Sequence, residues 1–77
     1  MADNVKNYYW QMYCDVWEFH KKYINGVCEE DSFWEAVVNE SNEIAKRHKE
    51  NKFIVGLLLN EIDEFERIYK ARKRESA

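Results

Sequence analysis

Apolar and polar positions along the chain follow the period of an α-helix in three segments. In the first, from about residue 4 to 24, apolar side chains repeat at alternating spacings of four and three residues, which places them on one stripe of a helix. This stripe consists of Val5, Tyr9, Met12, Val16, Phe19 and Tyr23. Asp3 or Asn4 is expected to cap the start of this helix, and Asn25-Gly26 to end it.

The second segment covers about residues 32–49 and follows the acidic run Glu29-Glu30-Asp31. Ser32 and Glu35 have the spacing of a capping box, in which each side chain accepts a hydrogen bond from a free backbone amide of the first turn. Its apolar arc consists of Phe33, Trp34, Val37, Val38, Ile44 and Ala45. The basic residues 46–49 suit the negative end of the helix dipole.

The third segment covers about residues 52–74. Its central stripe consists of Val55, Leu58, Ile62, Phe65 and Tyr69. Gly56 falls on the polar side of this helix, where it costs about 1 kcal/mol relative to alanine. The pattern gives no packing reason for a glycine at this position.

The breaks between these segments are short, and the 77 residues contain no repeat and no long linker. Short connections place successive helices side by side in opposite directions. We therefore predict one all-α domain over residues 1–77, a small antiparallel three-helix bundle whose core is completed either within the chain or by dimerisation.

A second apolar stripe lies on the first helix, beside the one just described. It consists of Trp10, Tyr13, Trp17 and Ile24, and its tryptophans lie about 120° from the middle of the first stripe. Two interpretations remain open: the other helices wrap far enough round to cover it, or another chain does. Because Trp and Tyr are enriched at binding hot spots, we predict a protein-binding face that forms a homodimer or contacts a partner protein.

The charge distribution bears on the choice of partner. The net charge of −3 argues against nucleic acid as a partner, and residues 27–50 carry a net charge of −4. One basic cluster, at the end of the third helix, favours the alternative of a small DNA- or RNA-binding regulator. It consists of Lys70, Arg72, Lys73 and Arg74. Such a cluster also suits the negative end of a helix dipole without binding anything.

Four polar side chains fall within the apolar arcs: His20, Ser41, His48 and Glu61. Ser41 and His48 are about 10.5 Å apart along one helix, too far for a catalytic hydrogen bond. The metal-binding spacings His-x-x-x-His, Glu-x-x-His and Cys-x-x-Cys are absent, as is any Gly-rich phosphate loop, so we expect no catalytic residue, metal ion or cofactor. Because buried polar groups need partners, we predict that His20 or His48 pairs with Glu61.

These observations favour a non-enzymatic helical interaction module that acts by covering the surface of a partner protein. It would be a regulator or inhibitor, and the richness in Asn, Lys, Glu, Ile and Tyr suits a phage-encoded inhibitor of a bacterial defence complex. Two cysteines are too few for a disulfide framework, the N-terminus lacks signal-peptide character, and the longest apolar run is too short for a bilayer. We therefore expect a cytoplasmic protein that has no contact with a membrane.

Overall fold

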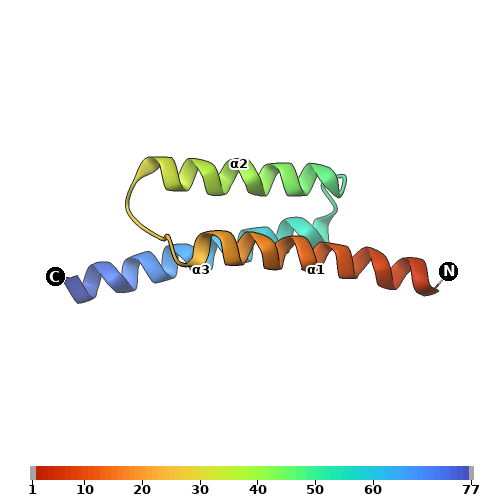
Figure 1. Ribbon diagram of the computed structural model, residues 1–77, viewed down its shortest axis with the longest axis horizontal. Helices are drawn as coiled ribbons and strands as arrows, with labels where there is room; N and C mark the ends of the chain where they lie inside the picture. The colour runs from red at the N-terminus through yellow and green to blue at the C-terminus, as the bar shows by residue number, and fades with distance from the viewer. Residues whose placement is uncertain (1, 77) are drawn as a thin grey trace.

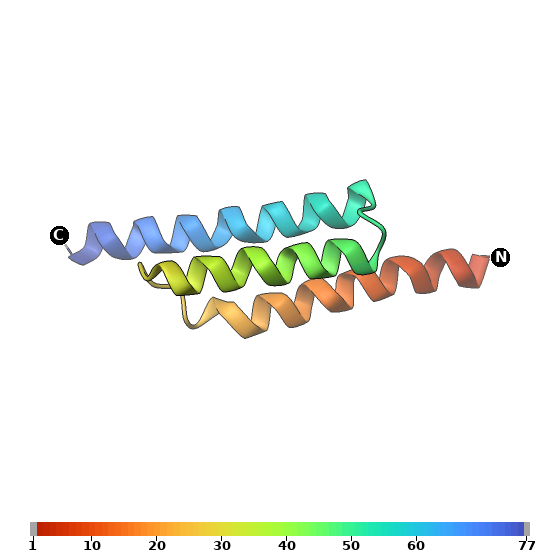
Figure 2. The same cartoon turned by 90° about the horizontal axis from the view of Figure 1, so that it is seen from above.

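The computed structural model confirms the all-α three-helix bundle. It describes the backbone of residues 2–76 and the side chains of residues 7–74. The helices are α1 (Ala2–Ile24), α2 (Asp31–Arg47) and α3 (Lys52–Ser76). α1 and α3 run in the same direction and α2 runs antiparallel to both (Figures 1 and 2). Because α1 and α3 extend past opposite ends of α2, the molecule is elongated, measuring 54 × 19 × 18 Å.

The core is small and draws on all three helices and one loop. Phe19 of α1 and Phe65 of α3 lie at its centre, with ring centroids 5.8 Å apart, and both are fully buried. The remaining buried apolar residues are Met12, Val27, Val37, Ile44, Ile54 and Leu58. Of the predicted α1 stripe, Val16 and Tyr23 pack at the edge of this core, and the side chain of Val5 lies outside the described residues.

The loop between α1 and α2 is anchored to two helices. Asn25-Gly26 ends α1 as predicted, and the Gly26 N–H donates to the Tyr23 carbonyl at 3.0 Å. Trp34 Nε1–H of α2 donates to the Cys28 carbonyl at 3.0 Å, and Arg72 Nη1–H of α3 donates to the Val27 carbonyl, also at 3.0 Å. The loop is therefore tied to the rest of the bundle by side chains of α2 and α3.

The predicted starts of α1 and α2 need correction, whereas α3 begins at Lys52 as predicted. α1 begins at Ala2, so Asp3 and Asn4 lie within its first turn, and their side chains are outside the described residues. α2 begins at Asp31 with Glu30 as its N-cap, and no side chain caps it. The predicted capping box is wrong because Ser32 sits inside the first turn, where its backbone is already helical and it cannot act as the N-cap.

α2 ends two residues earlier than predicted, in a Schellman-type turn. The Glu50 N–H donates to the Ala45 carbonyl at 2.7 Å, and the Lys49 N–H donates to the Lys46 carbonyl at 3.0 Å. Lys49 and Glu50 have φ angles of 56° and 54°, in the left-handed region that usually favours glycine. The sequence gives no sign of this turn because neither residue is the expected Gly or Asn.

Two exposed positions show how narrow the contact faces are. Val38, which the pattern placed in the apolar arc of α2, is 46% exposed, because that arc is wider than the face that α2 presents to its two neighbours. Gly56 is exposed on α3, and a methyl group added there would meet no atom within 4 Å. Within the described part of the chain, none of the helices has the length and apolarity needed to cross a membrane.

Candidate functional site: an aromatic surface on the outer face of α1

A ridge of large aromatic rings lies on the side of α1 that faces away from the core. Trp10, Tyr13 and Trp17 expose 64%, 54% and 57% of their surface. Ile24, which the sequence grouped with them, is instead half-buried against the core, because α1 ends there and the chain turns toward α2. We call the ridge together with Tyr9 and Phe53 the aromatic surface.

Phe53 joins the ridge to α3. Its ring meets Tyr9 edge-on at a centroid distance of 5.2 Å and Tyr13 edge-on at 5.6 Å. Edge-to-face contacts of this kind add stabilisation beyond the area they bury. Tyr13 is therefore held in place by another helix although more than half of it is exposed.

Trp17 is held by residues of its own helix. Its ring stacks on the imidazole of His20, with centroids 5.6 Å apart and planes 13° from parallel. The Lys21 ammonium lies 5.6 Å from the Trp17 centroid and also forms an ion pair with Glu18 at 3.0 Å. The Trp17 end of the aromatic surface is thus bordered by a pair of opposite charges.

His20 in turn is hydrogen-bonded to α3. Its Nδ1–H donates to Oε1 of Glu61 at 2.8 Å, and the two side chains are 30% and 15% exposed. The structure therefore places His20, one of the two histidines predicted as a partner, beside Glu61. The result is a continuous series of contacts from Glu61 through His20 to Trp17.

His48 has a different partner, which the sequence analysis missed. Its Nε2 lies 2.6 Å from Oδ2 of Asp15, and Arg47 Nη1 lies 3.3 Å from the same oxygen. Asp15 belongs to neither apolar stripe of α1, yet helical spacing puts it only about 60° from Met12, at the edge of the core face. This angle indicates that the Asp15 side chain can reach a neighbouring helix, but it does not identify which helix supplies the partner.

The other side chains considered for catalysis or metal binding do not come together in the fold. Ser41 is buried within α2. Cys14 and Cys28 are free, half-buried thiols. Among the residues that the structure describes, no group of three or more His, Cys, Asp or Glu side chains converges in a way that would hold a metal ion.

A polar cluster joins the end of α1 to the middle of α2. Lys22 Nζ–H donates to Oε1 of Glu40 at 2.6 Å, and the Tyr23 hydroxyl donates to the same oxygen at 2.9 Å. Burial alone would raise the pKa of Glu40, but the two hydrogen bonds and the charge of Lys22 outweigh it and lower that pKa. Burial and the hydrogen bond to Glu40 raise the pKa of Tyr23.

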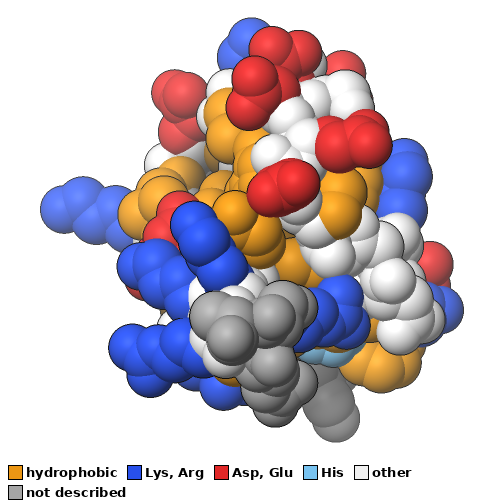
Figure 3. Space-filling view, turned by 90° about the vertical axis from the view of Figure 1, so that its left-hand side faces the viewer, with side chains coloured by type: hydrophobic (Ala, Val, Ile, Leu, Met, Phe, Trp, Pro, Cys, Tyr) orange, Lys and Arg blue, Asp and Glu red, His pale blue; other side chains and the backbone are white. Residues whose placement is uncertain are grey.

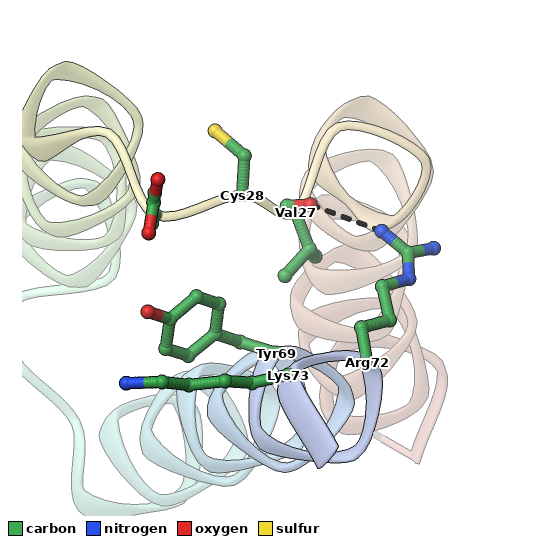
Figure 4. Close-up of a pocket in the computed structure, with 6 residues that line it drawn as sticks. Val27, Cys28, Tyr69, Arg72 and Lys73 are labelled. Atoms are coloured by element: carbon green, nitrogen blue, oxygen red, sulfur yellow. Dashed lines mark hydrogen bonds between the residues drawn. The ribbon is translucent and has the colours of Figure 1, made fainter. Parts of the chain in front are cut away.

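In the basic cluster at the end of α3, Arg72 is bonded within the fold. Figure 3 shows Lys and Arg side chains gathered on one side of this end of the molecule and acidic side chains on the opposite side. Arg72 turns back to the Val27 carbonyl at the wall of a pocket of about 360 Å³ (Figure 4). Tyr69, the aromatic beside the cluster, packs edge-on against Trp34 at a centroid distance of 6.2 Å. Lys70, Lys73 and Arg74 are exposed.

Comparisons with protein-family models, with curated proteins and with solved structures find no match to this chain.

Proposed function

We propose that the protein is a non-enzymatic interaction module that binds protein partners through the aromatic surface of α1. The observation that carries this proposal is the exposure of Trp10, Tyr13 and Trp17, each more than half exposed, beside a core that is filled without them. Fully burying a large apolar side chain stabilises a structure by about 1.5–3 kcal/mol. Folding leaves these three rings in water. A partner that covers the ridge buries them, and this burial contributes to the free energy of binding.

The size of the aromatic surface suits a protein partner. Its five rings each present about 150–250 Å² in total, so at the exposures observed they offer on the order of 500 Å² of apolar area. This matches the largest patches of soluble monomers and, with a polar rim, approaches the ~800 Å² per partner of a standard interface. The ring contacts with Phe53 and His20 also fix side chains before binding, which reduces the entropy lost on association.

We propose a second copy of the chain as the occupant of this surface. A two-fold interface sets the same patch against itself, so it needs a patch without a strong charge of one sign. The aromatic rings are uncharged and the adjacent Glu18 and Lys21 neutralise each other. The acidic α2 region and the basic end of α3 would instead repel their own copies.

Light scattering after size exclusion tests self-association. We expect a mass near twice the 9.4 kDa of one chain at tens of micromolar, and the monomer mass for Trp10→Ala combined with Trp17→Ala. Leu59→Ala is the matched control, because Leu59 is as exposed as Trp17 but lies on α3 outside the aromatic surface. A monomeric wild type would overturn the dimer. If the double tryptophan variant and Leu59→Ala both remain dimeric, the dimer interface lies outside the aromatic surface.

A photo-crosslinking residue tests protein binding independently of the dimer. We expect benzoylphenylalanine in place of Tyr13 to crosslink a protein in the cells that make this chain, and the same residue in place of Leu59 to give none. Crosslinks to a second copy support the dimer. Crosslinks only to a different protein support the interaction module and overturn the dimer. Equal crosslinking yields from positions 13 and 59 would mean that the aromatic surface is not the binding site.

A nucleic-acid-binding regulator is the second candidate, favoured by the exposed Lys70, Lys73 and Arg74. Against it stand the bond between Arg72 and the loop backbone and the edge-on contact of Tyr69 with Trp34, since both side chains already have partners within the fold. Phosphate contacts weaken steeply with salt, by about one logarithmic unit of slope per contact. A gel shift with mixed DNA and RNA at low salt that stays blank removes this candidate.

A further inference from the structure

We infer that His20 is a positioning residue for the aromatic surface and that its protonation makes binding through Trp17 sensitive to pH. The inference rests on the proposed function of that surface and adds its regulation. It starts from the contacts of a single ring: His20 stacks on Trp17 on one side and bonds to Glu61 at its edge.

The geometry makes His20 the link between an exposed ring and a partly buried anchor. Trp17 is 57% exposed, whereas the Glu61 side chain is 15% exposed and lies on a different helix. A tryptophan on the outer face of a single helix would otherwise sample several rotamers. Restricting the side chain to one rotamer on binding costs conformational entropy. Because Glu61 fixes the imidazole, and the imidazole lies flat against the indole, Trp17 is ordered before any partner arrives.

Protonation strengthens both of these contacts. Histidine is the side chain that changes charge between pH 5 and 8. A positive imidazole over an indole adds a cation–π attraction, and a charged donor shortens and strengthens the bond to a carboxylate. Trp17 is therefore held more firmly at the acidic end of this range than at the basic end.

Charged groups of both α1 and α3 lie round His20. From α3, Glu61 bonds to the ring directly, and the electrostatic influence of His20 reaches Glu64, which is itself held by Arg67 at 2.6 Å. From α1, the nearby cation is Lys21, which lies by the Trp17 ring and is paired with Glu18. The other ring that approaches His20 is Phe65, which carries no charge.

The second histidine provides an internal control. His48 also bonds to a carboxylate, Asp15, but the ring next to it is Tyr8 at a centroid distance of 6.5 Å and not a stacked tryptophan. Trp10 lines a pocket with His48 without stacking on it. The chain thus contains one histidine pair that holds an exposed tryptophan and one that does not.

NMR of the full chain between about pH 5 and pH 8 tests the coupling. We expect the indole N–H signal of Trp17 to follow the titration of the His20 ring, while those of Trp10 and Trp34 do not. Glu61→Gln, which keeps the shape of the side chain, should reduce the shift of the Trp17 signal and move the His20 titration. Glu66→Gln, on the exposed side of α3, should change neither. A Trp17 signal that stays constant or follows His48 would overturn the inference.

The dimer dissociation constant supplies the functional readout. The added cation–π attraction predicts association about two- to fivefold tighter near pH 5.5 than near pH 8, and His20→Phe, which keeps a flat ring, should abolish this pH dependence. A pH-independent dissociation constant overturns the inference and leaves the dimer standing. A monomer whose Trp17 signal still follows His20 overturns the proposed partner and retains the positioning role.

Discussion

Both faces of α1 carry large aromatic side chains, in different surroundings. Phe19 on the inner face is fully buried against Phe65, whereas Trp10 on the outer face is 64% exposed and Trp17 is 57% exposed. The inner ring stabilises the fold because folding removes it from water, and the outer rings gain that stabilisation only from a partner. Aromatic content alone therefore does not define the core of such a small domain; position round the helix decides which rings serve the fold.

The largest expected effect comes from removing the central inner ring. Phe19→Ala should cost about 3–5 kcal/mol of unfolding free energy, because it loses buried area and leaves a cavity. In a domain this small that approaches the whole stability. Urea denaturation followed by circular dichroism measures it. A loss below about 1 kcal/mol would mean that the inner face is not the core.

Gly56→Ala extends the comparison to the outer face of α3. The added methyl group meets no atom within 4 Å, so only the helix propensity changes, and we expect a gain of about 1 kcal/mol. A rise in the thermal midpoint with an unchanged oligomeric mass is the expected result. Destabilisation would show that something covers this face of α3.

Glu40→Gln addresses the polar boundary between α1 and α2. Its pKa is lowered below the ordinary value of 4.5 in the fold, so its charge contributes stability above that pH and loses the contribution as pH falls through the lowered value. We expect the variant to lose about 0.5–1 kcal/mol near pH 7 and less than this near pH 3. Paired urea titrations at the two pH values measure this, and an equal difference at both would exclude a contribution from charge.

The smallest effect on folding belongs to the outer face. Trp10→Ala should change the unfolding free energy by about 0.5 kcal/mol or less, measured at concentrations low enough to keep the chain monomeric. The same variant should weaken self-association far more than this. A large loss of monomer stability would place Trp10 in the fold and contradict the division between the two faces.

Helical periodicity predicted the elements well because the core positions repeat over several turns. Met12, Phe19, Leu58 and Phe65 all lie on the stripes it identified and all are buried. Local signals did worse at the helix ends: the turn after α2 uses Lys49 and Glu50 in a conformation that their side chains disfavour, so composition could not reveal it.

Cross-helix pairs were the hardest part of the site to predict. Periodicity indicates which side of a helix a residue occupies, but it does not give the axial offset between two helices. His20 beside Glu61 was one of two open pairings, and His48 beside Asp15 depended on an offset that only the packed bundle determines. The exposure of Trp10 and Trp17 was also one of two open interpretations, because their angle round α1 does not tell how far α2 and α3 wrap round that helix.

The staggered ends of α1 and α3 have a hydrodynamic consequence. A particle measuring 54 × 19 × 18 Å is nearly three times as long as it is wide, so it experiences more friction than a sphere of the same mass. A single chain will therefore leave a sizing column early and resemble a larger species. Two copies that cross on their α1 helices would form a more compact particle for their mass, so association should raise the mass more than it raises the apparent size.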